Sequence, residues 1–294
     1  MLIVSVNGGL GNQMFQYAFG RAVSLNRKVP LKLDLLEYGL FQNNPSHREY
    51  ELDIFKIVAS PATKKEVMSL ADSNPFINLL NKYLRTNISP FSSSNIRESD
   101  LKVDLKKLSA MENIYLRGYW QSEKYFKKYR NLLLKEFVFP KKISRKNNSV
   151  LKIIKSSNSI SIHVRRGDYV SDTKTNKYHG ICGIDYYLKA INYFNKSIIN
   201  PQYFVFSDDI KWCKEHFPKL ENVKYISHNQ GNKSWEDMRL MSNCKHNIIA
   251  NSSFSWWGAW LNSHASKIIV APEKWFADSK ANSTDIIPVD WVKM

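Results

Sequence analysis

The sequence predicts an α/β protein of two domains, built on parallel strands with helices packed against them. The chain has 294 residues, a length that fits two domains of roughly 150 residues each. The N-terminal half opens with an apolar strand, a glycine loop and a helix. The C-terminal half alternates short apolar strands with helices, which is typical of a doubly wound sheet.

The N-terminal half begins as a strand–loop–helix–strand unit. Residues 2–6 are apolar, and a loop rich in glycine follows at residues 7–12. Apolar residues then recur at helical spacing over residues 14–25. A second apolar stretch, residues 29–33, ends in Asp34. This order predicts neighbouring parallel strands.

The boundary between the domains is predicted at a charged stretch almost free of apolar residues, residues 140–149. We expect a linker there, with an N-terminal domain at residues 1–145 and a C-terminal domain at residues 150–294. Residues 40–110 mix short helical patterns with polar loops, and we expect an irregular region.

The C-terminal half shows a regular alternation of patterns. The strands are expected at residues 159–164, 203–206, 223–226, 248–250 and 267–271, and the helices at residues 186–194, 210–216, 235–244 and 254–261. Five strands alternating with four helices predict a doubly wound α/β domain.

The formal net charge is +17, which suits polyanionic partners such as nucleic acid, a phospholipid surface or a phosphorylated small molecule. The sequence contains no recognised nucleic-acid-binding module, so that we expect no nucleic-acid partner. Three cysteines without C-x-x-C spacing indicate neither a disulfide framework nor a zinc ribbon. Residues 1–6 are interpreted as a strand and not a signal peptide, and we expect a cytoplasmic protein.

Paired arginines end the first strand of the C-terminal half, in the run HVRRGDY at residues 163–169. Ligands of doubly wound sheets bind beyond the carboxyl ends of the strands, where Arg165 and Arg166 would meet an anion. A guanidinium group donates paired hydrogen bonds to phosphate, and Asp168 would orient one arginine. The alternative is a purely structural ion pair.

The next strand ends in Ser207, Asp208 and Asp209. Adjacent carboxylates suggest a metal, but metal-dependent hexose transferases usually carry Asp-x-Asp. We therefore expect Ser207 or Asp208 to cap the following helix, with a ligand contact in addition, and no metal.

Two further helices begin with polar residues. Ser234 and Asp237 match a capping box, whereas the Asp237 carboxylate would alternatively accept hydrogen bonds from guanine N1–H and N2–H₂. The run NSSF at residues 251–254 opens a helix, and the free N–H groups of a helix N-terminus suit phosphate. Simple capping by serine is the alternative there.

The glycine loop contains Gly9, Gly11 and Asn12 and resembles the pattern G-x-G-x-x-G. Met14 stands at the third glycine position, where glycine normally permits close helix–strand packing. The glycines expose backbone N–H groups, and Asn12 would donate to a phosphate or a ring oxygen. An NAD-dependent oxidoreductase with Asp34 as ribose ligand is an alternative, but it leaves the arginine pair unexplained.

Four long motifs follow one another along the chain. They are GGLGNQMFQYAFGRA at residues 8–22, RGYWQSEKYF at 117–126, HVRRGDY at 163–169 and NSSFSWWGAWL at 251–261. Together they resemble the bacterial α-1,2-fucosyltransferases of glycosyltransferase family eleven, and the resemblance covers nearly the whole chain.

The resemblance implies a GT-B-like fold, two Rossmann-like domains that face a central cleft, with the acceptor on the N-terminal domain and GDP-fucose on the C-terminal domain. It places Arg165 at the β-phosphate, Asp237 at the guanosine and Asn12 in the cleft. The catalytic residues are expected to be Arg165, Asn12 and His163. The donor-binding residues are expected to be Gly9, Gly11, Asn12, Arg165, Arg166, Asp168, Ser207, Asp208, Asp237, Asn251, Ser252, Ser253 and Phe254.

The resemblance also implies inverting, metal-independent transfer of L-fucose from GDP-fucose to the 2-hydroxyl of a terminal β-galactoside. Fucosyltransferases of α-1,6 or protein O-linked specificity remain alternatives. The sequence identifies neither the acceptor nor the general base. We hypothesise a lipid-linked acceptor and peripheral contact with the inner face of the membrane, because basic residues favour anionic lipid.

Overall fold

The computed structural model describes residues 1–40, 48–71, 95–98, 108, 111–217, 220–279, 281 and 283–294. The chain divides into two compact units, Met1–Val138 and Phe139–Met294, called unit 1 and unit 2 below. Each unit contains a sheet in which all recorded strand pairs are parallel. The predicted α/β class with two Rossmann-like domains is therefore confirmed, while their facing across a cleft stays a prediction.

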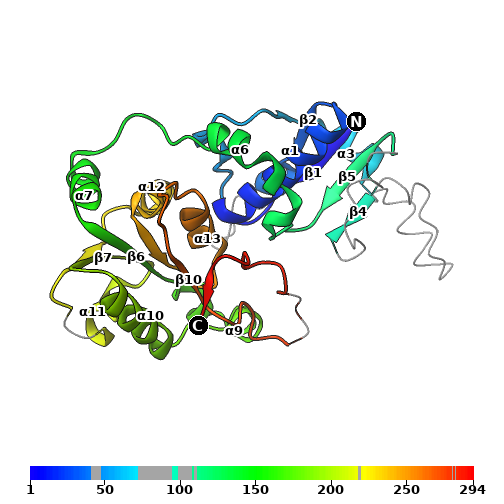
Figure 1. Ribbon diagram of the computed structural model, residues 1–294. Coiled ribbons are helices and arrows are strands. Elements are labelled where there is room, and N and C mark those ends of the chain that lie inside the picture. The colour runs from blue at the N-terminus through cyan, green and yellow to red at the C-terminus, as the bar shows by residue number, and fades with distance from the viewer. Residues whose placement is uncertain are drawn as a thin grey trace. The chain divides into compact units, whose positions relative to one another are not determined.

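Five strands of the described part of unit 1 form a sheet in the order β3-β2-β1-β5-β4 (Figure 1). The strands are β1 (Leu2–Ser5), β2 (Leu31–Asp34), β3 (Ser60–Pro61), β4 (Asn95–Arg97) and β5 (Ile114–Arg117). The helices are α1 (Leu10–Arg27), α2 (Leu36–Leu40), α3 (Lys64–Leu70) and α6 (Arg130–Glu136), with 3-10 turns η1 (Leu52–Ile54), η3 (Glu123–Tyr125) and η4 (Lys127–Tyr129). The predicted irregular region lies partly outside the described residues.

Helix α1 packs closely on one face of this sheet because of Gly20. A Cβ atom on Gly20 would lie 2.4 Å from Cγ2 of Val4 and 3.1 Å from Cδ1 of Leu31. The close approach that the sequence pattern assigns to the third glycine of the loop is thus made two turns later, and Met14 is simply buried in the core. The opposite face packs Ile3 against α3.

Unit 2 has a six-stranded sheet in the order β11-β10-β9-β6-β7-β8. The strands are β6 (Asn158–Val164), β7 (Pro201–Ser207), β8 (Val223–Ile226), β9 (His246–Ile248), β10 (Ile269–Ala271) and β11 (Val292–Lys293). The helices are α7 (Arg145–Ser156), α8 (Gly167–Ser171), α9 (Thr173–His179), α10 (Ile184–Ser197), α11 (Ile210–His216), α12 (Trp235–Asn243) and α13 (Ser253–Trp260), with the 3-10 turn η5 (Gly231–Lys233).

The sheet of unit 2 is covered on both faces (Figure 1). Helices α10 and α11 lie on one side, and α7, α12 and α13 lie on the other. Alternate residues of β6, namely Ile160, Ile162 and Val164, belong to the core cluster that includes Tyr187 and Phe194 of α10. The tryptophans of α13 are also buried, as their helical spacing predicts.

The predicted linker is wrong over its second part. Ser144 caps α7 by accepting a hydrogen bond from the backbone N–H of Asn147 at 3.1 Å, so that residues 145–149 are helical. Three other features of unit 2 were not predicted. They are α8, α9 and the edge strand β11, and β9 begins and ends two residues earlier than expected. The last strands are too short to show a pattern of their own.

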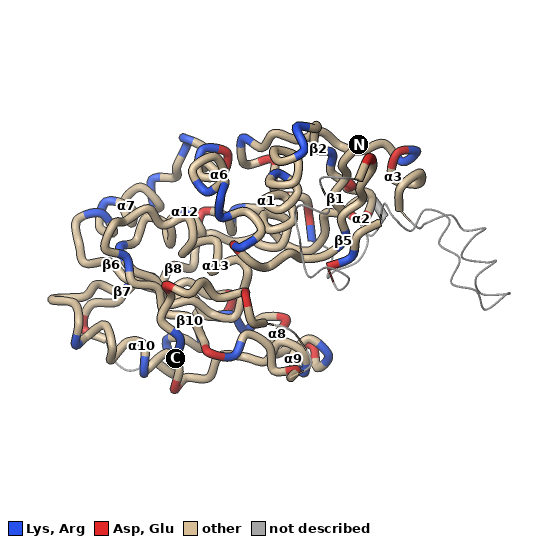
Figure 2. The backbone as a smooth tube through the Cα atoms, turned by 45° about the vertical axis from the view of Figure 1, so that its right-hand side comes forward, with Lys and Arg blue, Asp and Glu red and all other residues tan. Residues whose placement is uncertain are grey.

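Lys and Arg residues are distributed over both units in Figure 2, including α6, α7 and α10. Within the described residues, no helix is long and apolar enough to cross a bilayer. All three cysteines are free thiols, as predicted.

Candidate functional site

The chain order of the strands puts one switch point in each sheet. In unit 2 the chain runs outward from β6 to β8 and then returns to β9 on the other side of β6, so that the switch point lies between β6 and β9. In unit 1 it lies between β1 and β5. Ligands of open α/β sheets bind in the crevice at such points. Each of the four family-like motifs follows one of these four strands.

At the switch point of unit 2, Arg165 follows β6 and is held by two carboxylates. Its guanidinium group forms ion pairs with Asp168 and, at 2.6 Å, with Oδ2 of Asp208. Glycine at position 167 lets Asp208 approach closely, because a Cβ atom there would lie 2.6 Å from the same Asp208 oxygen. The predicted orienting contact from Asp168 is present, and Asp208 adds a second one that the sequence did not reveal.

Arg166 is held by the helix that follows the neighbouring strand. Its Nε atom donates to Oδ2 of Asp209 at 3.2 Å, and its guanidinium carbon lies 4.1 Å from the centroid of the Trp212 ring. Its backbone N–H donates to Oδ1 of Asp208 at 2.8 Å. Both arginines therefore have fixed directions before any ligand arrives.

The capping prediction at this strand end is wrong in its residue. Asp209 caps α11 by accepting from the backbone N–H of Trp212 at 3.0 Å, while the Ser207 hydroxyl accepts from the N–H of Asp209 at 2.9 Å. Asp208 is not a cap because both its oxygens face the arginine pair. Two guanidinium groups thus meet three carboxylates, and an anionic ligand would compete with these carboxylates for the N–H donors.

The N-terminus of α13 lies on the other side of the switch point. Ser252 is the N-cap residue but contributes no side-chain cap bond, and its carbonyl accepts the first helical bond, from the N–H of Trp256 at 3.0 Å. The N–H groups of Ser253, Phe254 and Ser255 precede that bond and point out of the helix end. These N–H groups and the serine hydroxyls are the donors that an anion needs.

Asn251 and His163 have packing roles. The side-chain amide of Asn251 donates to the backbone carbonyls of His179, Gly180 and Trp275 at 2.9, 3.3 and 3.2 Å, so it holds these loops together. The His163 ring lies 5.7 Å from the ring of Phe254, which joins the two motifs.

Burial argues against the catalytic role expected for His163. Its side chain is buried, and burial followed by the charge of Arg165 lowers its pKa to about 3. The imidazole is neutral at physiological pH, and so weak a base is poorly suited to accept a proton from a sugar hydroxyl.

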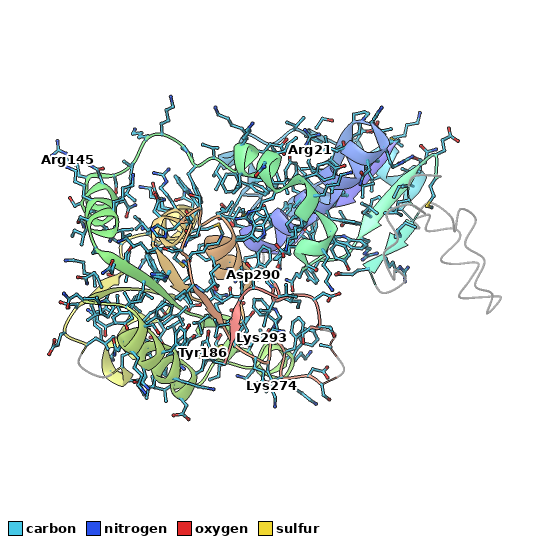
Figure 3. The ribbon with its side chains drawn as sticks, in the orientation of Figure 1. Arg21, Arg145, Tyr186, Lys274, Asp290 and Lys293 are labelled. Atoms are coloured by element: carbon cyan, nitrogen blue, oxygen red, sulfur yellow. The ribbon has the colours of Figure 1, made fainter. Side chains whose placement is uncertain are left out.

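A cavity of about 340 Å³ opens beside Asn251 at the carboxyl ends of β9 and β10. Its walls combine aromatic and polar residues, including Tyr186 and Lys274, which Figure 3 labels, and His179. Walls of this mixed composition suit a sugar ring.

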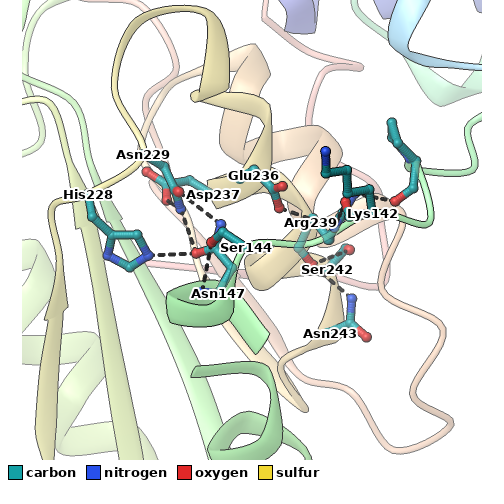
Figure 4. Close-up of polar contacts among 11 residues, drawn as sticks. Lys142, Ser144, Asn147, His228, Asn229, Glu236, Asp237, Arg239, Ser242 and Asn243 are labelled. Atoms are coloured by element: carbon teal, nitrogen blue, oxygen red, sulfur yellow. Dashed lines mark hydrogen bonds and ion pairs between the residues drawn. The ribbon is translucent and has the colours of Figure 1, made fainter. Parts of the chain in front are cut away.

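Asp237 lies in the first turn of α12, but the predicted capping box is absent. Ser234 has helical backbone angles and makes no side-chain cap bond. The Asp237 carboxylate instead accepts from Nδ2 of Asn229 at 2.7 Å (Figure 4). Burial raises the pKa of Asp237 to about 7, against the lowering effect of Asn229. The ionised form of Asp237 accepts hydrogen bonds, and it predominates only above about pH 7.

At the switch point of unit 1, side-chain amides hold the glycine loop, while Arg97, Glu98 and Arg117 line a cavity beside Gly118. Gly8 adopts a positive φ of 73°, and a Cβ atom on it would lie 2.9 Å from Nδ2 of Asn12. The Asn12 Oδ1 atom accepts from Gln121 at 2.9 Å, which orients its Nδ2 group as a donor. Gln16 Nε2 donates to Oδ1 of Asn7 at 3.1 Å and to the carbonyl of Gly118 at 3.2 Å. The two motifs of unit 1 therefore meet, as the two of unit 2 do.

Gly9 and Gly11, both predicted to bind the donor, occupy different positions in α1. Gly9 is the N-cap residue of α1 and has no side chain to bond the helix end, whereas Gly11 is buried within the helix. The structure brings Glu51 to this helix end, where its Oε2 atom accepts from the N–H of Leu10 at 3.2 Å. Burial raises the pKa of Glu51. No local pattern predicts this carboxylate, because Glu51 lies 41 residues from Leu10 in the chain.

Asp34 is not placed as a ribose ligand. One carboxylate oxygen accepts from the hydroxyl of Tyr115 at 2.7 Å, and the other accepts from the N–H of Leu36 at 3.0 Å. The side chain is buried. These contacts disfavour the NAD-dependent alternative. Across the described residues, no group of three or more His, Cys, Asp and Glu side chains is arranged to hold a metal ion.

The fold is thus an α/β protein of two units, and the sequence motifs lie at the switch point of each sheet. The chain belongs to glycosyl transferase family 11, whose model matches residues 61–294. A nucleotide-sugar donor and a glycan acceptor are the substrates that this membership implies. The family resemblance read from the four motifs is thereby confirmed.

Two full-length relatives come from Escherichia coli. The chain is 38% identical to an alpha-1,2-colitosyltransferase over 298 residues, which cover 100% of this chain and 99% of the relative. It is 33% identical to the O-antigen biosynthesis glycosyltransferase WbnK over 307 residues, which cover 98% and 99%. Human galactoside alpha-(1,2)-fucosyltransferase 1 is 27% identical over 155 residues, which cover 50% of this chain and 42% of that protein.

Proposed function

We propose that this glycosyltransferase moves L-fucose from GDP-L-fucose to the 2-hydroxyl of a terminal galactoside, with inversion at the anomeric carbon and without a metal. One observation carries the proposal. Arg165, Arg166 and the open N-terminus of α13 lie at the switch point of one sheet, where a diphosphate would meet guanidinium and backbone donors together.

In the proposed reaction, the oxygen of the acceptor 2-hydroxyl bonds to fucose C1 while the bond between C1 and the β-phosphate oxygen breaks through an oxocarbenium-like state. The hydroxyl proton is released to water. Negative charge grows on the departing GDP. Arg165, Arg166 and the N–H groups that open α13 stabilise that charge from fixed positions, which costs little reorganisation during the reaction. Asp168 is the most exposed of the three carboxylates, with 42% of its side chain accessible, and it is the partner that the phosphate displaces.

The acceptor binds in this proposal to unit 1. Side-chain amides and backbone groups around Gly9 and Asn12 offer both donors and acceptors, the complement of a sugar's hydroxyl groups. The names of the human relative, a galactoside alpha-(1,2)-fucosyltransferase, and of the 38% relative, an alpha-1,2-transferase, support the acceptor and the linkage.

Colitose is a second candidate for the transferred sugar, because the 38% identical relative is named a colitosyltransferase. L-colitose is L-fucose without the 3-hydroxyl group. Both donors would place the same GDP group at the arginine pair, so the difference depends on a single hydroxyl. A site that hydrogen-bonds this hydroxyl would reject the analogue that lacks it.

The decisive test offers the purified protein GDP-L-fucose or GDP-L-colitose with a panel of β-galactosides, and identifies products by mass and by NMR linkage analysis. We expect α-1,2-fucosylated product, formed equally well in EDTA. A product from GDP-colitose alone would replace the donor, and another linkage would replace the acceptor position. Loss of transfer in EDTA, restored by a divalent ion, would overturn the metal-free mechanism.

Membrane contact is proposed as a separate feature, motivated by the net charge of +17. Co-sedimentation with vesicles should increase with their content of anionic lipid and decrease with salt. Equal sedimentation with neutral and anionic vesicles would remove the proposal. A lipid-linked galactoside would then have to be presented to a protein in solution.

A further inference from the structure

A network of side-chain amides supports Asp237 from outside its own helix (Figure 4). Asn229 lies after β8, and Asn147 lies in the first turn of α7. Nδ2 of Asn147 donates to Oδ1 of Asn229 at 2.9 Å, and Nδ2 of Asn229 donates back to Oδ1 of Asn147 at 3.1 Å. Nδ2 of Asn229 also donates to Oδ1 of Asp237 at 2.7 Å. Asn147, from a distant part of the chain, is thus linked to the Asp237 carboxylate through Asn229.

This reciprocal pair leaves Asn229 a single orientation. Its amide nitrogen has two hydrogens, and one is directed at Asn147 and the other at Asp237. Its oxygen accepts from Asn147, so rotating the amide by 180° would set like groups against each other. Asn147 is 1% exposed, and Nε2 of His228 lies 2.6 Å from its Oδ1 atom. A buried amide with all its contacts made is costly to displace.

The chain before α7 is fastened to α12, which keeps Asn147 in place. The guanidinium group of Arg239 donates to the backbone carbonyls of Pro140 and Lys142. The rings of Phe139 and Trp235 stack with centroids 6.2 Å apart. The segment that the sequence predicts to be a linker is therefore packed against α12, and it helps to hold the side chains that contact Asp237.

The amides of Asn147 and Asn229 hold the Asp237 carboxylate in one orientation, and this orientation affects which ligand it can bind. Each carboxylate oxygen has two lone pairs, so Oδ1 of Asp237 can accept from Asn229 and from a ligand together. A carboxylate held in this way matches two neighbouring donors, such as guanine N1–H and N2–H₂. Hypoxanthine lacks the 2-amino donor, and adenine presents an acceptor at N1.

We infer that Asn147 and Asn229 are positioning residues that aim the Asp237 carboxylate at the base edge and thereby set the preference of the enzyme for guanine. This inference rests on the proposed use of a GDP-sugar. The residues act through Asp237, far in the chain from the arginine pair. They affect which nucleotide binds and not how the fucose–phosphate bond breaks.

The test compares affinities for GDP, IDP and ADP by calorimetry at pH 8, above the pKa of about 7 of Asp237. One hydrogen bond to a charged group contributes about 1.5–3 kcal/mol, so the unaltered protein should prefer GDP over IDP by about 10- to 100-fold. Asn147→Ala should reduce this ratio to about twofold or less. It should also raise the KM for GDP-fucose while leaving kcat nearly unchanged.

Asn243→Ala is the matched control, because Asn243 lies on α12, donates to the carbonyl of Arg239 at 2.8 Å and is exposed. We expect it to keep the full preference for GDP. Asn147→Asp keeps the size and the acceptor oxygen but removes the donor to Asn229, and it should also lose the preference. This variant replaces Asn147→Ala if circular dichroism shows the latter to be unfolded.

Two outcomes separate the inference from the proposed function. If Asn147→Ala and Asn147→Asp weaken GDP and IDP by the same factor, the amides are only structural and the inference fails. If the unaltered protein binds neither GDP nor IDP, the proposed donor itself is wrong. If both variants weaken GDP selectively and Asn243→Ala does not, the inference stands.

Discussion

At the switch point of unit 2 the polar contacts join guanidinium groups to carboxylates, whereas at that of unit 1 the loop contacts are made mainly by side-chain amides. Arg165 and Arg166 are paired with aspartates after β7 and in α8. Asn12 and Gln16 bond to neutral partners. Both edges come from the same arrangement, a strand, a tight loop and a helix on a parallel sheet.

This difference indicates which substrate each edge can recognise. Opposite charges held in fixed directions suit a ligand whose charge changes during a reaction. Neutral amides suit a ligand that must be oriented through hydroxyl groups without being held too tightly. The same fold thus supports two recognition tasks, and the side chains that follow the strands decide between them.

The largest effect is expected when the charged edge loses Arg165. Arg165→Ala removes the donor that stabilises the departing phosphate and should lower kcat by about 10²–10³-fold. Steady-state kinetics with GDP-fucose and a galactoside measure it. Arg145→Ala is the matched control, because Arg145 is exposed and projects outward from α7 (Figure 3). A variant at position 165 that retains more than about a tenth of the rate would contradict the role.

Asp237→Asn should weaken binding and increase stability together. The asparagine side chain lacks the negative charge and one of the two oxygen acceptors that would bind guanine. The affinity for GDP should therefore decrease by about 10- to 100-fold. Burial raises the pKa of Asp237 to about 7, so the folded chain holds this proton more tightly than the unfolded chain. The cost of ionising it is absent below about pH 4, grows as the pH rises towards 7 and levels off above 7.

Thermal melting at pH 5 and pH 8 checks the second part of that prediction. The stabilisation by Asp237→Asn should be larger at pH 8, and about 3–4 kcal/mol is its upper limit. An equal change in melting temperature at the two pH values would mean that the carboxyl is not shifted. Ser242→Ala, on the same helix, should show no pH-dependent difference.

Asn12→Ala should separate the two edges. Because Asn12 lies at the switch point of unit 1, where the acceptor is proposed to bind, we expect the acceptor KM to rise by about five- to tenfold. This rise corresponds to the loss of about one hydrogen bond. The Kd for GDP should stay within about twofold. Calorimetry with GDP and kinetics with varied galactoside measure the two quantities. A comparable loss of GDP affinity would show that unit 1 also holds the nucleotide.

The smallest effect is expected for Glu51→Gln, which tests whether the charge of this carboxylate matters at the switch point of unit 1. Glutamine keeps an oxygen that can accept from the N–H of Leu10 and loses only the charge. Transfer rate and melting temperature should be nearly unchanged, whereas Glu51→Ala should cost about 1 kcal/mol through the lost cap. A rate reduced more than about tenfold by Glu51→Gln would mean that this carboxylate serves in catalysis.

Local patterns were sufficient for most of unit 2. Strands such as β6 and β8 and helix α11 follow from their apolar spacing, because each buries one face against a layer of its own unit. The arginine pair was identified as well, since a strand end in a parallel sheet is a position that sequence can locate. The prediction of a capping box at Ser234 was wrong, because the Asp237 carboxylate accepts a hydrogen bond from Asn229 instead.

Sequence alone determined the class of fold, the family and the four motifs, since these depend on periodicity and on long local runs of residues. Only the tertiary structure decided which partners those residues have. Asp208 meets Arg165, Glu51 meets the start of α1, and Asn147 meets Asn229 across distances in sequence that no local pattern spans. The physical reason is that hydrogen bonds and ion pairs are made by whichever groups the packed core brings within reach.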